Sequence, residues 1–157
     1  MTTVIRRASA ADADLLSSLN TDVQAIHASA LPWHFKPPGP DTFPPAAAAA
    51  VLAQPDNLVF IAEIDSLPAG YAYAEIVRRP ESSFHYAYEM VHLHHISVSP
   101  TWRRQGCGRA LLDAVRTAAS KTGIDLMTLD VWTFNEEARA FFQRRGFTSW
   151  SERLWNR

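Results

Sequence analysis

Residues 92–112 read HLHHISVSPTWRRQGCGRALL and join a strand, a basic turn and the beginning of a helix. The strand ends at Pro100, the turn contains Gly106 and Gly108, and an amphipathic helix follows. A turn of this kind directs free backbone N–H groups and the positive end of the helix dipole at an anion. The stretch therefore predicts a site for a pyrophosphate group at the start of this helix.

The length and composition of the chain indicate one soluble globular domain over residues 1–157. The 157 residues are 47% hydrophobic and 20% charged. No segment has the ~20 apolar residues that a membrane span requires. The formal net charge of −1 argues against a nucleic-acid-binding protein, because such proteins concentrate positive charge. The single cysteine, Cys107, excludes an intrachain disulfide and suits a reducing compartment, so we expect a cytoplasmic protein.

Hydrophobic periodicity and turn signals predict elements in the order β-α-α-β-β-β-α-β-α-β. Strands are expected over residues 3–8, 58–64, 71–77, 84–98, 126–131 and 147–155, and helices over 11–30, 46–53, 106–121 and from Asn135 to Gly146. Three strands joined by turns favour an antiparallel half, and the later β-α-β unit implies a parallel pair with a right-handed crossover. The predicted fold class is α/β, more narrowly α+β, around a mixed and mainly antiparallel central sheet.

The residues of the basic turn have the chemistry that a nucleotide-like cofactor needs. Gly106 and Gly108 let the chain approach a phosphate closely, and Arg103, Arg104 and Arg109 supply cations. The pattern is neither a Walker loop nor the dinucleotide-binding Gly-x-Gly-x-x-Gly. Two other interpretations stay open: a tight turn with solvated arginines, and a module that binds a different nucleotide.

Two motifs carry a resemblance to a known family. The segment Arg103–Gly108, after a strand that ends in Val-x-Pro, resembles the acyl-CoA signature of GNAT-type N-acetyltransferases. The segment Asn135–Phe147 resembles the helix of that family that contains Asn and closes in Gly-Phe. The resemblance implies the GNAT fold, with six to seven strands in the central sheet and about four helices. It also implies acetyl-CoA as the acyl donor and no metal.

The same resemblance assigns the residues that bind the cofactor. The backbone of residues 96–98 would hold the pantetheine arm and the thioester carbonyl, and the N–H groups of residues 104–109 would hold the pyrophosphate. Asn135 would form a hydrogen bond near the pantetheine or the splayed strand. The predicted set is Ile96, Ser97, Val98, Arg103, Arg104, Gln105, Gly106, Cys107, Gly108, Arg109 and Asn135.

His92 and His94 are the candidates for the catalytic base. A free alkylamine has a pKa of ~10.4, so only about one molecule in a thousand is nucleophilic at pH 7. The two histidines share a face of the strand, whereas His95 points the other way unless a bulge intervenes. His-Leu-His here resembles the corresponding strand of arylalkylamine N-acetyltransferases, which implies that both draw the amine proton through water. Half-buried structural histidines are the alternative, Glu75 and Glu89 are fallback bases, and no third ligand completes a zinc site.

Two positions bear on the mechanism. Many members of the family have a Tyr that protonates the leaving thiolate, and the resemblance puts Phe142 at that position. A water molecule or a tyrosine such as Tyr86 or Tyr88 could replace it, or no general acid is used. Cys107 has no histidine partner in the pattern, so we do not expect a ping-pong mechanism.

The proline-rich segment over residues 31–45 is expected to border the acceptor. The predicted acceptor residues, whose rings could stack on a flat or cationic substrate, are His27, Trp33, His34 and Phe35. Alternatively, these aromatic residues only anchor the loop to the sheet. We predict direct acetyl transfer in a ternary complex to a primary amine of a small molecule or peptide, by a monomer or a homodimer, with no nucleic-acid or membrane partner. A non-catalytic acyl-CoA-binding sensor of the same fold is the alternative function.

Overall fold

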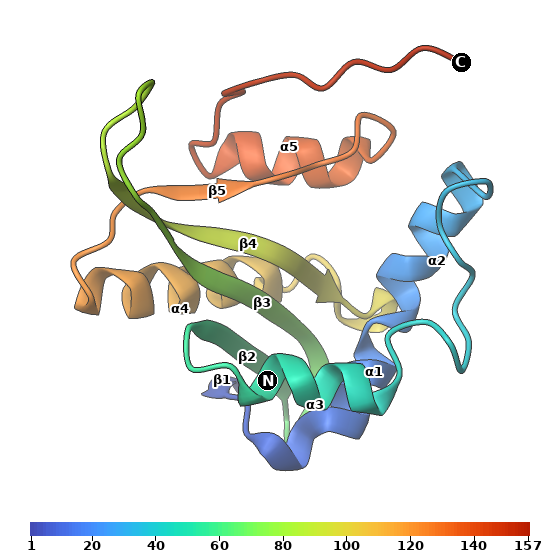
Figure 1. Ribbon diagram of the computed structural model, residues 1–157. Coiled ribbons are helices and arrows are strands. Elements are labelled where there is room, and N and C mark those ends of the chain that lie inside the picture. Colours follow the sequence, from blue (N-terminus) through green and yellow to red (C-terminus); the bar gives the residue numbers. More distant parts are fainter.

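The computed structural model describes residues 1–157 and contains one five-stranded sheet with helices on both faces (Figure 1). The strands are β1 (Thr3–Arg7), β2 (Asn57–Ile64), β3 (Leu67–Arg79), β4 (Tyr88–Val98) and β5 (Met127–Leu129). They lie in the order β1-β2-β3-β4-β5, and only the β4–β5 pair is parallel. This arrangement confirms the α+β class and the mixed, mainly antiparallel sheet.

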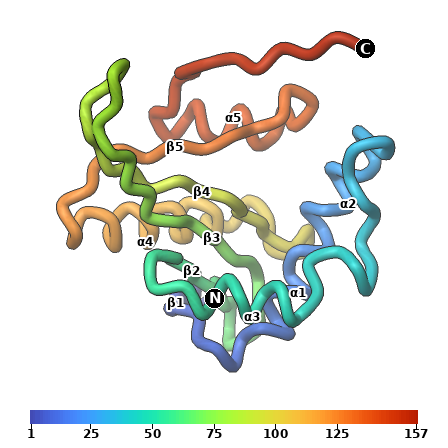
Figure 2. The backbone as a smooth tube through the Cα atoms, in the orientation of Figure 1, coloured from blue at the N-terminus to red at the C-terminus, as the bar shows by residue number.

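The helices divide the core into two parts. They are α1 (Ala13–Leu19), α2 (Thr21–Ala30), α3 (Pro45–Ala53), α4 (Cys107–Lys121) and α5 (Glu136–Arg144), with short 3-10 helices at Ala10–Asp12 and Pro100–Trp102. The amphipathic α4 buries its apolar stripe against one face of the sheet, and α1 and α3 cover part of the other face. Figure 2 shows that β5, α5 and the C-terminal segment lie at the end of the sheet opposite β1. No helix has both the length and the apolar character needed to cross a membrane.

A one-residue bulge in β4 changes which histidines share a face. Tyr73 pairs with His95 and Ala74 pairs with Leu93, so His94 has no partner on β3. The extra residue shifts the alternation of side chains, and both Leu93 and Ile96 pack into the core beneath α4. His95 therefore lies on the opposite face, together with His92, as the sequence allowed only if a bulge intervened.

Gly70 lets β3 and β4 approach closely just before the basic turn. A Cβ atom at this position would collide with the carbonyl oxygen of Ser97 on β4. We expect Gly70→Ala to lower the free energy of unfolding by about 2 kcal/mol or more, because neither backbone can move without breaking the ladder. Urea denaturation measures this loss. Gly39→Ala is the matched control, since no atom lies within 4 Å of its added Cβ. Equal stability of the two variants would contradict this account of Gly70.

Three predictions about the elements are wrong. The sheet has five strands rather than six to seven, because residues 147–155 form no strand. Trp150 and Trp155 in that segment are each 69% exposed, and Trp155 contacts the ring of Trp33, 5.9 Å between centroids, rather than a neighbouring strand. The strand predicted over 84–98 begins at Tyr88, and residues 80–87 form the loop of the β3–β4 hairpin. The single helix predicted over 11–30 is divided near Asn20, whose side chain turns to a partner on β3.

Candidate active site

The start of α4 has free backbone donors. Gly106 is the N-cap residue, and its φ of 86° is the left-handed conformation that glycine adopts without strain. The first backbone bond of the helix runs from the N–H of Ala110 to the carbonyl of Gly106. The N–H groups of residues 107–109 therefore precede the ladder, and no side chain caps them. Three N–H groups and the helix dipole converge here, as the sequence predicts.

The basic turn is braced by its own side chains. Arg103 Nε donates to the carbonyl of Val98 at 3.0 Å, which ties the turn to the end of β4. Arg104 adopts a φ of 61°, and its side chain and that of Arg109 are exposed beside the helix start. Gln105 makes only a long contact, 3.4 Å, with the carbonyl of Thr101. Arg103 thus has a structural partner, Arg109 has only a long and exposed ion pair with Asp113, 3.9 Å, and Arg104 has no such pair.

Cys107 faces the core and not the turn. The side chain is 1% exposed and belongs to the apolar cluster beneath α4. Burial raises the pKa of the thiol, so it stays protonated and unreactive at neutral pH. This packing agrees with the expectation that Cys107 is not a nucleophile.

β4 and β5 separate after a short contact. Their ladder contains only the pairs Val91–Met127, His92–Thr128 and Leu93–Leu129. Residues 96–98 pair with β3 alone, so their other edge has no strand beside it. The free edge leads directly into the basic turn, which places the predicted pantetheine and pyrophosphate segments in one continuous line.

Asn135 begins α5 beyond the opening between β4 and β5. Its side-chain oxygen accepts a hydrogen bond from the N–H of Ala138 at 3.2 Å, as an N-cap does. Its amide nitrogen and the second lone pair of the oxygen are left for a ligand. The structure therefore gives Asn135 a helix-capping role in addition to the predicted contact with the cofactor.

His92 and His94 come together on the face of the sheet opposite α4. Their ring centroids are 4.9 Å apart. The Nδ1 atom of His92 lies 2.8 Å from the hydroxyl oxygen of Thr128, and that hydroxyl donates to the sulfur of Met90 at 3.4 Å. The Thr128 oxygen therefore accepts from Nδ1–H, which leaves the lone pair on Nε2. Burial first, and then the neighbouring His94, lower the pKa of His92, so its imidazole is neutral at pH 7.

His94 is held by a carboxylate and an aromatic ring. Its Nε2 lies 2.8 Å from Oε2 of Glu75, and its ring stacks on Tyr73 with centroids 4.8 Å apart. Glu89, the other fallback base, is instead paired with Arg78 at 3.3 Å near the far end of β3. Of the two carboxylates, only Glu75 belongs to the histidine cluster. The His, Cys, Asp and Glu side chains of the protein form no group of three that could hold a metal ion.

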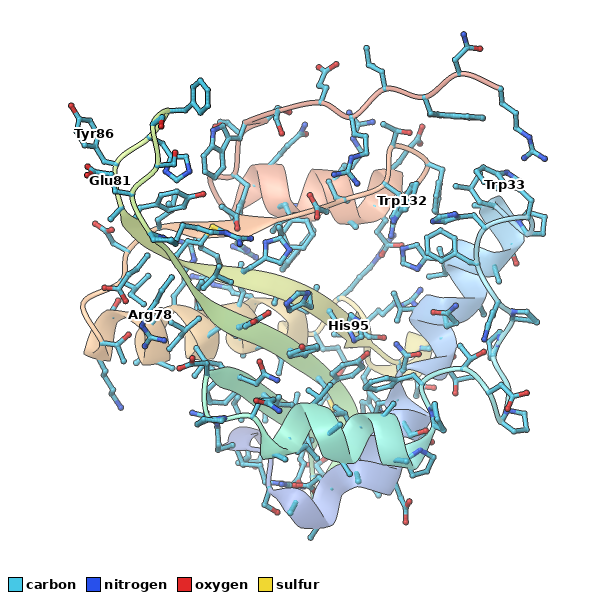
Figure 3. The ribbon with its side chains drawn as sticks, viewed as in Figure 1. Trp33, Arg78, Glu81, Tyr86, His95 and Trp132 are labelled. Atoms are coloured by element: carbon cyan, nitrogen blue, oxygen red, sulfur yellow. The ribbon has the colours of Figure 1, made fainter.

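The predicted acceptor residues meet two rings from the segment before α5, and Trp33 also contacts Trp155, with centroids 5.9 Å apart. Phe35 contacts His27 at 5.0 Å and Trp132 at 5.1 Å between centroids, and Phe134 contacts His27 at 5.7 Å. Figure 3 shows Trp33 and Trp132 near each other where α2 approaches the segment between β5 and α5, with His95 further inside. We call this group the aromatic rim; its members are His27, Trp33, His34, Phe35, Trp132 and Phe134.

Neither Tyr86 nor Tyr88 lies where it could replace the tyrosine that the family uses as a general acid. Phe142 is 7% exposed and packs between Phe141 and Phe147. Tyr86 lies in the hairpin loop with 86% of its surface exposed, far from His95 in Figure 3. Tyr88 is at the beginning of β4 beside His85. The positions of these two tyrosines therefore do not support the general-acid role considered for them from the sequence.

Sequence reasoning missed several residues at this site. Trp132 and Phe134 directly precede Asn135, but nothing local indicates that they turn toward the loop after α2. Tyr71 and Tyr73 lie two positions apart on a predicted strand, so their side chains share a face. The sequence does not indicate which side chains of the neighbouring strand they contact. The hydrogen bonds of Asn20 and His95 to Tyr71 join positions 51 and 24 residues apart, and only the folded chain brings them together.

Comparisons with known proteins agree with this architecture. Residues 21–147 match the model of the acetyltransferase (GNAT) family. A variant of the BH1408 protein from Bacillus halodurans has a similar structure, with a TM-score of 0.92, 22% identity and 98% of each chain covered. The aminoglycoside N-acetyltransferase AAC(6')-Iy in complex with CoA has a TM-score of 0.72 and 22% identity over 99% of this chain and 94% of that one. A transcriptional regulator from Bacillus halodurans C-125 gives 0.76 and 16% over 99% of both chains. No curated protein matches the sequence.

Proposed function

This chain belongs to the acetyltransferase (GNAT) family, and from that membership we propose that it transfers an acetyl group from acetyl-CoA to a primary amine of a small molecule. The amine attacks the thioester directly while both substrates are bound. The proposal depends on one observation: β4 has a free edge that leads to the uncapped start of α4, and a histidine cluster on its open face. The free edge suits acetyl-CoA, the acetyl donor, and the histidine cluster suits the amine that accepts the acetyl group.

The residues of the turn fit acetyl-CoA. The free N–H groups of residues 107–109 can bind the pyrophosphate, with Arg104 and Arg109 as exposed cations beside it. No protein atom lies within 4 Å of the space where a Cβ of Gly106 would stand, so the approach is open. The unpaired edge of residues 96–98 can bind the pantetheine amides, and a strand N–H there stabilises the negative charge that develops on the thioester oxygen.

His92 is the proposed base. Its imidazole is neutral at pH 7 and carries its lone pair on Nε2, so it can take the amine proton directly or through one water molecule. Asp130 Oδ2 lies 3.7 Å from this Nε2 and stabilises the imidazolium that forms, although its exposure to solvent weakens the effect. His94, anchored by Glu75, completes the polar face toward which the amine is directed.

The leaving thiolate takes its proton from solvent in this mechanism. Phe142 has no hydroxyl, and no tyrosine of the hairpin reaches the site. A coenzyme A thiolate is a tolerable leaving group near neutral pH, so transfer does not require a general acid. The absence of this acid is the one observation that favours the second candidate function, an acyl-CoA-binding sensor without catalysis.

A calorimetric titration with acetyl-CoA, run beside ATP and NAD, tests the proposal first. We expect micromolar affinity for acetyl-CoA and none for ATP or NAD. Release of free thiol is then followed with a panel of primary amines that includes aromatic amines, because of the aromatic rim, and aminoglycosides, because of the named acetyltransferase. Tight binding without thiol release from any amine would support the sensor, and tight binding of ATP or NAD alone would contradict both functions.

A further inference from the structure

His95 is the histidine of β4 that the proposed base chemistry does not use. Its ring packs edge-on against Tyr73 and Phe43, with centroids 5.3 and 5.6 Å away. It lies near the middle of the structure, further inside than the aromatic rim (Figure 3). Its Nδ1 is 3.0 Å from the hydroxyl oxygen of Tyr71.

A chain of hydrogen bonds fixes the position of the proton on His95. The side-chain nitrogen of Asn20 donates to the hydroxyl oxygen of Tyr71 at 2.9 Å. Tyr71 is fully buried, and burial raises the pKa of its phenol far above neutrality, so the hydroxyl keeps its proton. The only acceptor for this proton is Nδ1 of His95. Nδ1 therefore accepts, and the proton of the neutral imidazole is on Nε2.

The imidazole stays neutral over the working range of pH. Burial, with smaller contributions from the neighbouring His94 and His27, lowers the pKa of His95 to about 4. The other titratable groups that face the ring are the phenols of Tyr71 and Tyr73, which are neutral at pH 7. Nε2 has no hydrogen-bond partner in the protein, and it is not one of the fully buried polar atoms, so it keeps some contact with solvent.

We propose that His95 is a fixed hydrogen-bond donor for the acceptor substrate, and that its Nε2–H binds an oxygen atom of the molecule that carries the reacting amine. The inference deepens the proposed acetyl transfer and rests on it. The side chain lies on the face of the histidine cluster and not on the edge of β4 that suits the thioester, so its ligand belongs to the acceptor. Tyr73 contacts both His94 and His95, so the proposed oxygen site adjoins the histidine cluster. The site thus selects primary amines with a hydroxyl, ether or carbonyl oxygen several bonds away.

Nitrogen NMR of the histidine side chains tests the proton position without relying on activity. We expect His95 to show the Nε2–H tautomer and no titration between pH 5.5 and 8. This range begins more than one pH unit above the pKa of about 4 that burial gives the imidazole. Asn20→Asp should reverse the direction of these hydrogen bonds. The carboxylate accepts from the hydroxyl of Tyr71, and the hydroxyl oxygen then accepts from Nδ1–H of His95. Tyr71→Phe should remove the preference for the Nε2–H tautomer, whereas Tyr73→Phe, which removes the hydroxyl of another ring in contact with His95, should leave the tautomer unchanged. An Nδ1–H tautomer or a transition near pH 6.5 in the unmodified protein would overturn the inference.

Titration of the same signals with amines tests the ligand. With CoA present, amino alcohols of increasing chain length should shift the Nε2 resonance of His95, and alkylamines of equal length should not. In steady-state assays, His95→Phe should raise KM for amino alcohols about tenfold relative to KM for alkylamines, as expected for one lost hydrogen bond. Equal shifts from both amine series, or an equal change in both KM values, would contradict the donor role. An absence of acetyl transfer to every amine would instead contradict the proposed function, while the NMR titration still decides the role of His95.

Discussion

Gly106→Val is expected to weaken the binding of acetyl-CoA at least a hundredfold, which corresponds to about 3 kcal/mol. Gly106 has a φ of 86°, and a β-branched residue adopts this conformation only with strain. The added side chain would also stand in the open space before the N–H groups of residues 107–109, where the pyrophosphate is proposed to bind. Isothermal titration calorimetry measures the affinity.

Gly123→Val is the matched control for this prediction. Gly123 follows the other end of α4, has a φ of 78°, and likewise has no atom within 4 Å of an added Cβ. Both variants carry similar backbone strain, but only the change at residue 106 blocks the proposed site. Retained affinity in Gly106→Val would refute the site, and an equal loss in both variants would mean that the integrity of α4 is what the titration reports.

Replacing His92 and His94 together by alanine is expected to lower kcat roughly a hundredfold to a thousandfold at pH 7. Burial lowers the pKa of His92, so the unmodified enzyme is active above that pKa and loses rate as the pH falls through it. The double variant lacks this acid limb. Its rate should rise about tenfold per pH unit with the fraction of free amine, up to the amine pKa of ~10.4. The deficit therefore shrinks at high pH, as full pH profiles of kcat would show.

His85→Ala serves as the control for this second prediction. His85 lies in the exposed hairpin loop, where its Nδ1 contacts the carbonyl of Tyr86, and it is outside the histidine cluster. Its pH profile and acetyl-CoA affinity should equal those of the unmodified protein. A loss in the double variant that is uniform across pH would show that His92 and His94 only position other groups.

The parts of the structure that the sequence predicts are those determined by neighbours in the chain. Pro100, Gly106 and the apolar stripe of α4 act within a few residues, so the strand–turn–helix unit is predictable in detail. The same is true of Asn135, which caps α5 as its position indicates. The resemblance to GNAT acetyltransferases is confirmed by the match to the family model.

The parts that the sequence does not predict depend on contacts between distant segments. The segment after Phe147 alternates like a strand, but a strand also needs a paired edge, and this segment pairs with no strand of the sheet. Trp132 joins the aromatic rim only because α2 approaches the segment before α5. The proton position on His95 is set by Asn20 and Tyr71, and no periodicity links these two residues.

The bulge at His94 makes β4 sensitive to length more than to composition. A single extra position keeps Leu93 and Ile96 in the core while His92 and His95 lie on the opposite face. Deleting His94 itself would restore strict alternation and leave every other side chain of the strand on its present face, because His94 is the one residue without a partner on β3. The strand therefore has one position at which it can lose a residue; an insertion or deletion of one residue elsewhere in β4 would exchange the buried and exposed faces beyond it.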